Sequence, residues 1–116
     1  MIMLPSAVRI FLCTQPTDLR KSFDGLTGLV QECFGQDPLT GHLFLFLNRR
    51  RDRIKILYFD RDGLAIWYKR LEAGSFQMPP TMTQDGVELQ PTQLLMLLSG
   101  IDLRTARQRK RFHLAG

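Results

Sequence analysis

The stretch FLNRRRDRIKILYF, residues 46–59, places a dense positive charge between two apolar runs. Arg49, Arg50 and Arg51 are consecutive, and Arg53 and Lys55 follow within four residues. Guanidinium groups bind phosphate oxygens through paired hydrogen bonds, so this stretch could contact an anion. The alternative is a solvated hairpin tip whose long charged side chains only blunt the edge of a sheet.

The strands around this tip should bring further positive charge to it. We expect an antiparallel meander, in which the first turn lies at the same end of the sheet as the finish of the third strand. Residue 70 should then face residue 53, 54 or 55. Like charges opposed across strands are destabilising, which favours a surface that binds an anion. We predict that its phosphate-contacting residues are Arg49, Arg50, Arg51, Arg53, Lys55, Lys69 and Arg70.

A second basic segment follows Leu103. It has five Lys or Arg residues and no acidic residue, and its charge equals the formal net charge of the chain, +5. A basic chain favours anionic partners such as nucleic acid. We predict a basic tail that adds electrostatic contacts to DNA through Arg104, Arg107, Arg109, Lys110 and Arg111.

Catalytic chemistry has weaker support. A metal-dependent nuclease would need clustered carboxylates, and the candidates are Asp18, Asp24, Asp60 and Asp62. Asp18 stands where a helix cap belongs, and Asp60 and Asp62 stand where a turn favours Asp. Only Asp24 lacks a local explanation. The two histidines, His42 and His113, have no spacing typical of metal ligands. We therefore predict that the chain is not an enzyme and uses no metal or cofactor.

Five elements should precede the C-terminal part of the chain. A β-branched and aromatic strand is expected at 8–13. The spacing of Leu19, Phe23, Leu26, Val30 and Phe34 predicts a helix within 17–35, capped by Thr17 or Asp18 and ended by Gly35. Turn residues then separate strands at 43–47, 53–59 and 64–71.

The remaining elements complete an α+β domain. Residues 75–79 could add a short strand, and Pro91 suits the first turn of a helix that ends at Gly100. We predict a single domain over residues 1–102, mostly an antiparallel β-meander, with the N-terminal and C-terminal helices packed on the sheet. Residues 103–116 form the basic tail.

The environment of the protein is constrained by two further features. No apolar run approaches the about 20 residues needed to span a bilayer, and the N-terminus lacks the pattern of a signal peptide. We therefore expect a cytoplasmic protein without membrane partners. Cys13 and Cys33 lie in apolar surroundings and are interpreted as reduced core residues rather than a disulfide.

Three blocks of the chain resemble a known family. These blocks are TDLRKSFDGL (17–26), DRIKILYFDRDGLAIWYKRLEAGSF (52–76) and LLMLLSGID (94–102). They are similar, in this order, to the small accessory protein encoded by the second open reading frame of the sixty-six family of bacterial insertion sequences. The resemblance covers roughly residues 4–104. It implies a role in transposition beside a separate, larger transposase that carries the catalytic carboxylates.

Two hypotheses for the action of such a protein remain. The first is a DNA-binding accessory factor that helps to assemble the transposase on the element ends. The second is a protein-interaction module that contacts the transposase or a second copy of itself, as in a homodimer. Its surfaces would be the apolar helix at 94–101 and an open sheet edge. The sequence leaves DNA specificity, and the choice between single-stranded and duplex DNA, open.

Overall fold

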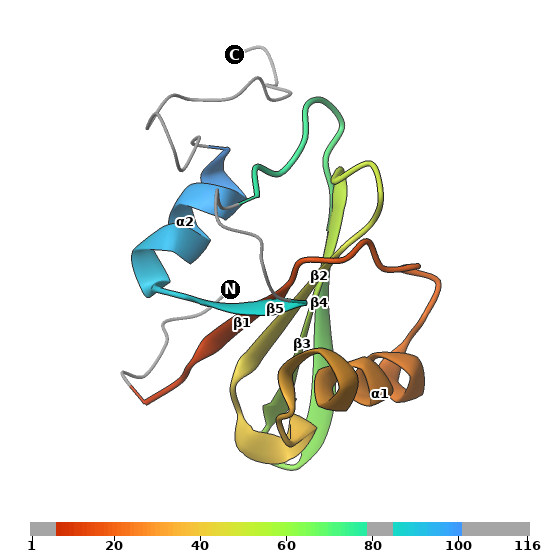
Figure 1. Cartoon of the computed structure of the whole chain (residues 1–116), viewed down its shortest axis with the longest axis vertical. Helices are drawn as coiled ribbons and strands as arrows, with labels where there is room; N and C mark the ends of the chain where they lie inside the picture. The colour runs from red at the N-terminus through yellow and green to blue at the C-terminus, as the bar shows by residue number, and fades with distance from the viewer. Residues whose placement is uncertain (1–6, 79–84, 101–116) are drawn as a thin grey trace.

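The chain folds as a five-stranded sheet with one helix on each face (Figure 1). The computed structural model describes residues 7–78 and 85–100. Along the chain the elements are β1 (Ile10–Cys13), α1 (Phe23–Phe34), a short 3-10 helix (Pro38–Thr40), β2 (Leu43–Leu47), β3 (Arg53–Asp60), β4 (Gly63–Arg70), β5 (Gly86–Leu89) and α2 (Pro91–Ser99). The α+β class predicted from the sequence is confirmed.

The strand order is β4-β3-β2-β1-β5. β2, β3 and β4 form the predicted antiparallel meander. β1 pairs in parallel with β2, and this pairing needs a crossover connection, which α1 supplies. The centre of the sheet is β2, whose five residues are all buried, as its unbroken apolar sequence predicts.

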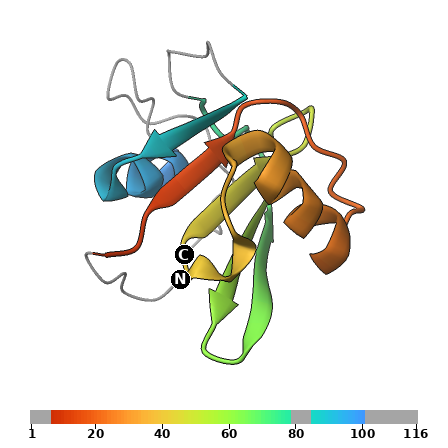
Figure 2. The same ribbon diagram turned by 60° about the horizontal axis from the view of Figure 1, so that its bottom comes forward.

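Each face of the sheet has its own apolar cluster. On one face, Leu26 and Val30 of α1 pack with Phe44, Phe46 and the neighbouring strands. On the other face, Leu94 and Leu97 of α2 pack with the opposite set of strand residues. Figure 2 shows the two helices on opposite sides of the sheet. Side chains alternate between faces along a strand, so this arrangement decides which way each charged residue of β3 and β4 points.

Two predicted elements are corrected. The first helix begins at Phe23 rather than near Thr17, and Asp18 does not cap it. Its predicted end is confirmed, because Gly35 follows in the left-handed conformation with φ 59°. Residues 75–78 form no strand, although Phe76 and Met78 are buried in the α2-side cluster.

A strand that the sequence analysis did not predict, β5, pairs antiparallel with β1. The pairing is reinforced on the surface by an ion pair of 2.7 Å between Arg9 and Glu88. The first residue of β5, Gly86, lies directly against the end of α1. A Cβ atom there would come within 2.5 Å of the Phe34 ring and 2.8 Å of the Cys33 carbonyl oxygen. The close approach of β5 and α1 therefore requires glycine at this position.

The replacement Gly86→Ala should destabilise the fold by about 1–3 kcal/mol, because the helix end must move to admit the methyl group. Urea unfolding measures the loss. The control is Gly28→Ala within α1, where an added Cβ meets nothing within 4 Å. That replacement should raise stability by about 0.5–1 kcal/mol through helix propensity. Equal effects of the two substitutions would contradict the packing argument.

The two cysteines meet where α1 crosses β1. Both are free thiols, and their sulfur atoms lie 3.2 Å apart. Cys13 is buried, as expected, and Cys33 is half-buried. Burial, together with the contact to the Cys13 thiol, raises the pKa of Cys33 from 9.0 to about 12. The folded protein therefore holds this thiol protonated at pH values where an exposed thiol ionises.

This raised pKa predicts a loss of stability in alkaline solution. Between about pH 9 and pH 12 the unfolded chain ionises Cys33 while the folded chain does not, so the equilibrium shifts toward unfolding as pH rises. Urea unfolding under reducing conditions, at neutral pH and near pH 10, should show a steeper decline for the natural protein than for Cys33→Ala. Parallel declines would show that this thiol is not the group responsible.

Candidate nucleic-acid interface

The loop between β2 and β3, residues 48–52, is called the basic tip below. The side chain of Asn48 closes it. Its Oδ1 accepts hydrogen bonds from the backbone N–H groups of Asp52 (3.1 Å) and Arg53 (3.0 Å), and its Nδ2 donates to Asp52 Oδ1 (2.6 Å). Arg51 has φ 59°, a left-handed conformation within this turn. The basic tip is therefore a hydrogen-bonded loop, in which the backbone that carries Arg49, Arg50 and Arg51 is fixed.

Segments from elsewhere in the chain hold the basic tip and its start in place. The Leu71 N–H donates to the Asp52 carbonyl (2.7 Å), and the Phe76 N–H donates to the Arg51 carbonyl (2.6 Å). On the other side, the Thr17 N–H donates to the Leu47 carbonyl, the last of β2 (2.8 Å). Phe76 is also buried in the core. The tip is thus attached to the packed part of the domain.

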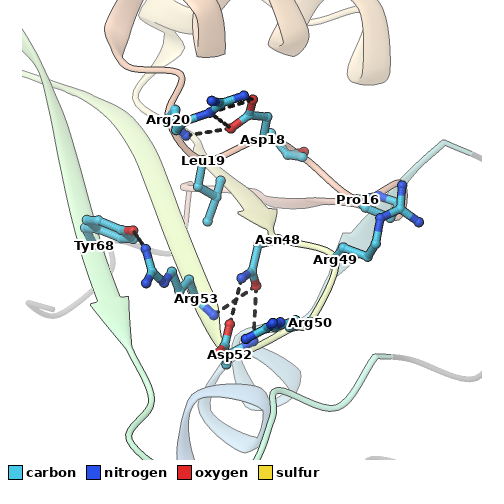
Figure 3. Close-up of a pocket in the computed structure, with 11 residues that line it drawn as sticks. Pro16, Asp18, Leu19, Arg20, Asn48, Arg49, Arg50, Asp52, Arg53 and Tyr68 are labelled. Atoms are coloured by element: carbon cyan, nitrogen blue, oxygen red, sulfur yellow. Dashed lines mark hydrogen bonds and ion pairs between the residues drawn. The ribbon is translucent and has the colours of Figure 1, made fainter.

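A pocket of about 690 Å³ opens beside the basic tip (Figure 3). Its walls come from the segment before α1, from the tip and from β4. The residues that line it are Pro16, Thr17, Asp18, Leu19, Arg20, Asn48, Arg49, Arg50, Asp52, Arg53 and Tyr68. Residues 17–20, which were predicted to belong to the first helix, therefore form part of one wall of this pocket.

The charges around the pocket are unequally compensated. Arg20 makes a two-pronged contact with Asp18 (2.7 Å), and this hydrogen-bonded pair lowers the pKa of Asp18 to about 2. Arg70 is paired with Glu72 (2.8 Å). Within the described residues, Arg49, Arg50 and Arg51 make no ion pair, and the guanidinium of Arg53 donates only to the neutral Tyr68 hydroxyl, 3.3 Å away. The uncompensated positive charge is therefore concentrated on the basic tip and the start of β3.

The predicted crowding of basic residues holds for part of the set. Arg53 and Arg70 are direct partners in the β3–β4 register, one of the three alternatives expected. Both lie at the end of the sheet that carries the basic tip. Arg70 is compensated by Glu72, however, so its contribution to the local positive field is smaller than its position suggests.

Lys55 and Lys69 are placed differently from the prediction. Lys55 is only 9% exposed, and its Nζ donates to the Lys21 carbonyl oxygen (2.8 Å), so it is not an exposed phosphate ligand. Lys69 is exposed but alternates onto the α2 side of the sheet, where it lines a hollow with Leu98 and Ser99. Arg53 is on the α1 side. The five predicted tail residues, Arg104, Arg107, Arg109, Lys110 and Arg111, lie outside the described residues.

Tyr68 is the site residue that the sequence analysis undervalued. Most aromatic rings of the strands were expected to fill the core, yet Tyr68 is 48% exposed. The Lys55 Nζ lies 4.9 Å from its ring centroid, and Arg53 contacts its hydroxyl. The usable signal was position: Tyr68 lies near the charged end of an edge strand, on the same face as Arg53 and Arg70, and shares their exposure.

The carboxylates do not assemble into a metal site within the described residues, where no cluster of three or more His, Cys, Asp or Glu side chains could hold an ion. Asp18 is occupied by Arg20, Asp60 ends β3, and Asp62 lies in the β3–β4 turn. The described helices include none that is both long and apolar enough to cross a membrane.

Comparison with known proteins identifies the family. The family model for the IS66 Orf2-like protein matches residues 8–108. The chain belongs to the IS66 Orf2-like family. Membership makes this chain an accessory protein associated with transposition of an insertion sequence, in a family described by its second reading frame rather than by an enzymatic activity.

Two relatives from Sinorhizobium fredii are each described as an uncharacterized protein. The chain is 36% identical to y4jC over 96 residues, which cover 82% of this chain and 80% of the relative. It is 39% identical to y4hO over 104 residues, which cover 88% and 90% respectively. No solved structure gives a significant match. Family membership therefore indicates the process, transposition, whereas the way in which the protein acts must be inferred from its structure.

The closing of the tip by Asn48 can be tested directly. Asn48→Ala should destabilise the protein by about 1–3 kcal/mol, because two backbone N–H groups lose their acceptor. Hydrogen exchange at the amides of Asp52 and Arg53 should accelerate. Arg49→Ala, which removes no contact described for the loop, should change stability by less than about 0.5 kcal/mol. Unchanged exchange at both amides in Asn48→Ala would contradict the proposed role.

Proposed function

We propose that this IS66 Orf2-like protein is a non-catalytic accessory factor that binds DNA phosphates through its basic tip and so assists the transposase at the element ends. The observation that carries this proposal is the set of three consecutive arginines, Arg49, Arg50 and Arg51, on a fixed loop without ion-pair partners among the described residues. Phosphate contact needs only charge and position, and both are present.

The contrast with neighbouring arginines supports this proposal. Arg20 and Arg70 each have a carboxylate within 2.8 Å, whereas the arginines of the basic tip project from a loop whose single carboxylate, Asp52, is engaged by Asn48. Uncompensated like charges on a short loop repel one another, and an anionic partner removes this repulsion. Because the loop backbone is already ordered, little further ordering of the backbone opposes binding.

The residues that we assign to this surface differ from the set predicted from the sequence. Arg49, Arg50, Arg51 and Arg53 form its centre, and Arg70 lies beside them. Lys55 contacts the Tyr68 ring and is not assigned to DNA, and Lys69 lies on the α2 side of the sheet. The basic residues after Leu103 keep their predicted role as an electrostatic arm.

The test is a fluorescence-anisotropy titration of the full chain against duplexes that carry the terminal repeats of the element, at several salt concentrations. Each neutralised phosphate contributes about −0.9 to the slope of log affinity against log salt. Replacing the three tip arginines should flatten the slope by about 2.7. Arg51 has a positive φ, which Asn tolerates better than Ala, so the variant is Arg49→Ala, Arg50→Ala, Arg51→Asn.

Arg61→Asn is the control, compared with the single replacement Arg51→Asn. Arg61 also has φ 59°, is exposed, and lies in the β3–β4 turn at the opposite end of these strands. It should leave the slope unchanged, whereas Arg51→Asn should flatten it by about 0.9. A slope that the triple variant does not change removes the basic tip from the mechanism. Absence of salt-dependent binding to any DNA overturns the proposal itself.

The second candidate is a protein-interaction module, which two exposed features favour. β4 is an edge strand of the described sheet, paired with β3 on one side only, and Leu95 on α2 is 65% exposed. An open edge accepts a further strand, and an exposed apolar helix face accepts a groove or a second copy. Under this alternative, co-purification with the transposase, or a homodimer, would persist at high salt and be weakened by Leu95→Glu.

A further inference from the structure

The pocket beside the basic tip contains more than a phosphate site needs. We infer that it binds one unpaired nucleotide, with the phosphate at Arg49 and Arg50 and the base against Tyr68. This inference rests on the proposed DNA-binding function and specifies the DNA: strands with unpaired residues, such as frayed or overhanging ends, in preference to uninterrupted duplex. Duplex bases are stacked on one another, so they cannot enter a pocket.

The exposed aromatic ring of Tyr68 is held in position by polar contacts. Tyr68 is about half exposed, but Arg53 contacts its hydroxyl at 3.3 Å, and Lys55 Nζ lies 4.9 Å from the ring centroid. Lys55 is itself held by the Lys21 carbonyl at 2.8 Å. A ring that is ordered by polar contacts while much of its surface stays open to solvent is suited to stacking on a base.

The walls of the pocket combine apolar, aromatic and positively charged side chains. Leu19, which is nearly buried, and Pro16 provide apolar surface, and Tyr68 provides an aromatic wall. Arg49 and Arg50 provide positive charge in the same pocket; Figure 3 shows Arg49 next to Pro16, and Arg53 next to Tyr68. Inorganic phosphate or a duplex backbone would use only the charged part. A nucleotide uses both parts, because it joins an anion to a flat, largely apolar base.

The volume of the pocket and its polar groups also fit a nucleotide. A volume of about 690 Å³ lies within the range of about 300–1,000 Å³ that is typical of small-molecule sites. The Asn48 side chain is engaged in closing the loop and Asp18 is occupied by Arg20, but Asp52, which also lines the pocket, accepts a side-chain hydrogen bond only from Asn48 among the described residues and retains acceptor capacity. A carboxylate accepts hydrogen bonds from the exocyclic amino group of a base, which an unpaired base leaves free.

The experiment compares three DNA ligands with the full-length protein by anisotropy at one moderate salt concentration. They are a blunt duplex, the same duplex with a short unpaired overhang, and the same overhang with abasic sites. The abasic ligand has the phosphates of the overhang but not its bases. We expect the base-bearing overhang to bind about tenfold tighter than the abasic overhang, as one stacked base allows.

Two substitutions at one position then test the pocket. Tyr68→Ala should reduce the ratio of the two overhang affinities to near one, whereas Tyr68→Phe should keep most of it, because the stacking surface remains. Phe23→Ala is the control: Phe23 is also an exposed aromatic, at 42%, but it lies outside the pocket. It should leave the ratio at its natural value. Circular dichroism confirms that each variant is folded.

The outcomes separate this inference from the proposed function. If all three DNAs bind with equal affinity and a steep salt dependence, the DNA-binding function stands and the nucleotide pocket is overturned. If the overhang is preferred but Tyr68→Ala keeps the preference, unpaired bases bind elsewhere and the pocket assignment is wrong. If no DNA binds in a salt-dependent way, the proposed function fails, and this inference fails with it.

Discussion

The burial of β2 on both faces is the constraint on which the rest of the structure depends. Five consecutive apolar residues cannot leave either face of a sheet in water, so α1 must cover one side and α2 the other. The parallel pairing of β1 with β2 follows, because a crossover helix both covers a face and returns the chain in the same direction. β2 ends at Leu47, and the charged sequence begins at the next residues. The basic tip therefore lies at the point where the core ends.

The elements predicted from the sequence are those whose pattern is local. The strands of the meander, the helix after Pro91 and the ending of α1 at Gly35 are set by hydrophobic runs, turn residues and caps, and they lie where they were expected. The predicted start of α1 was wrong because Leu19 has the spacing of a helix residue, although it lies in a loop that places its side chain in the core. Periodicity reports that a residue is buried, and it does not report the backbone conformation that buries it.

Other features depend on contacts between distant parts of the chain. The sequence of β5, GVEL, has only four residues and no apolar run, and it becomes a strand because β1 offers an edge and Gly86 fits under α1. The candidate site likewise combines features that are local in the sequence with features that depend on contacts between distant segments. The concentration of arginines was visible in the sequence, and alternation along β3 and β4 could have separated Lys55 from Lys69. The pairing of Arg20 with Asp18 spans only two residues and depends on the loop conformation that precedes α1. The pocket beside Tyr68 depends on how segments 16–20 and 48–53 come together, which no single stretch records.

The way in which the basic tip is held bears on what it can recognise. The carbonyls of Leu47, Arg51 and Asp52 accept hydrogen bonds from within the domain, and the amides of Asp52 and Arg53 donate to Asn48. With these backbone groups engaged, the proposed contact of the tip with DNA would use mainly guanidinium groups, which read charge and position more than sequence. Base-dependent contacts must then come from side chains beside the tip, and Tyr68 is the exposed aromatic residue that lines the pocket there. In the function that we propose, binding strength and discrimination between DNA forms would thus fall to different residues, the arginines for the first and Tyr68 for the second.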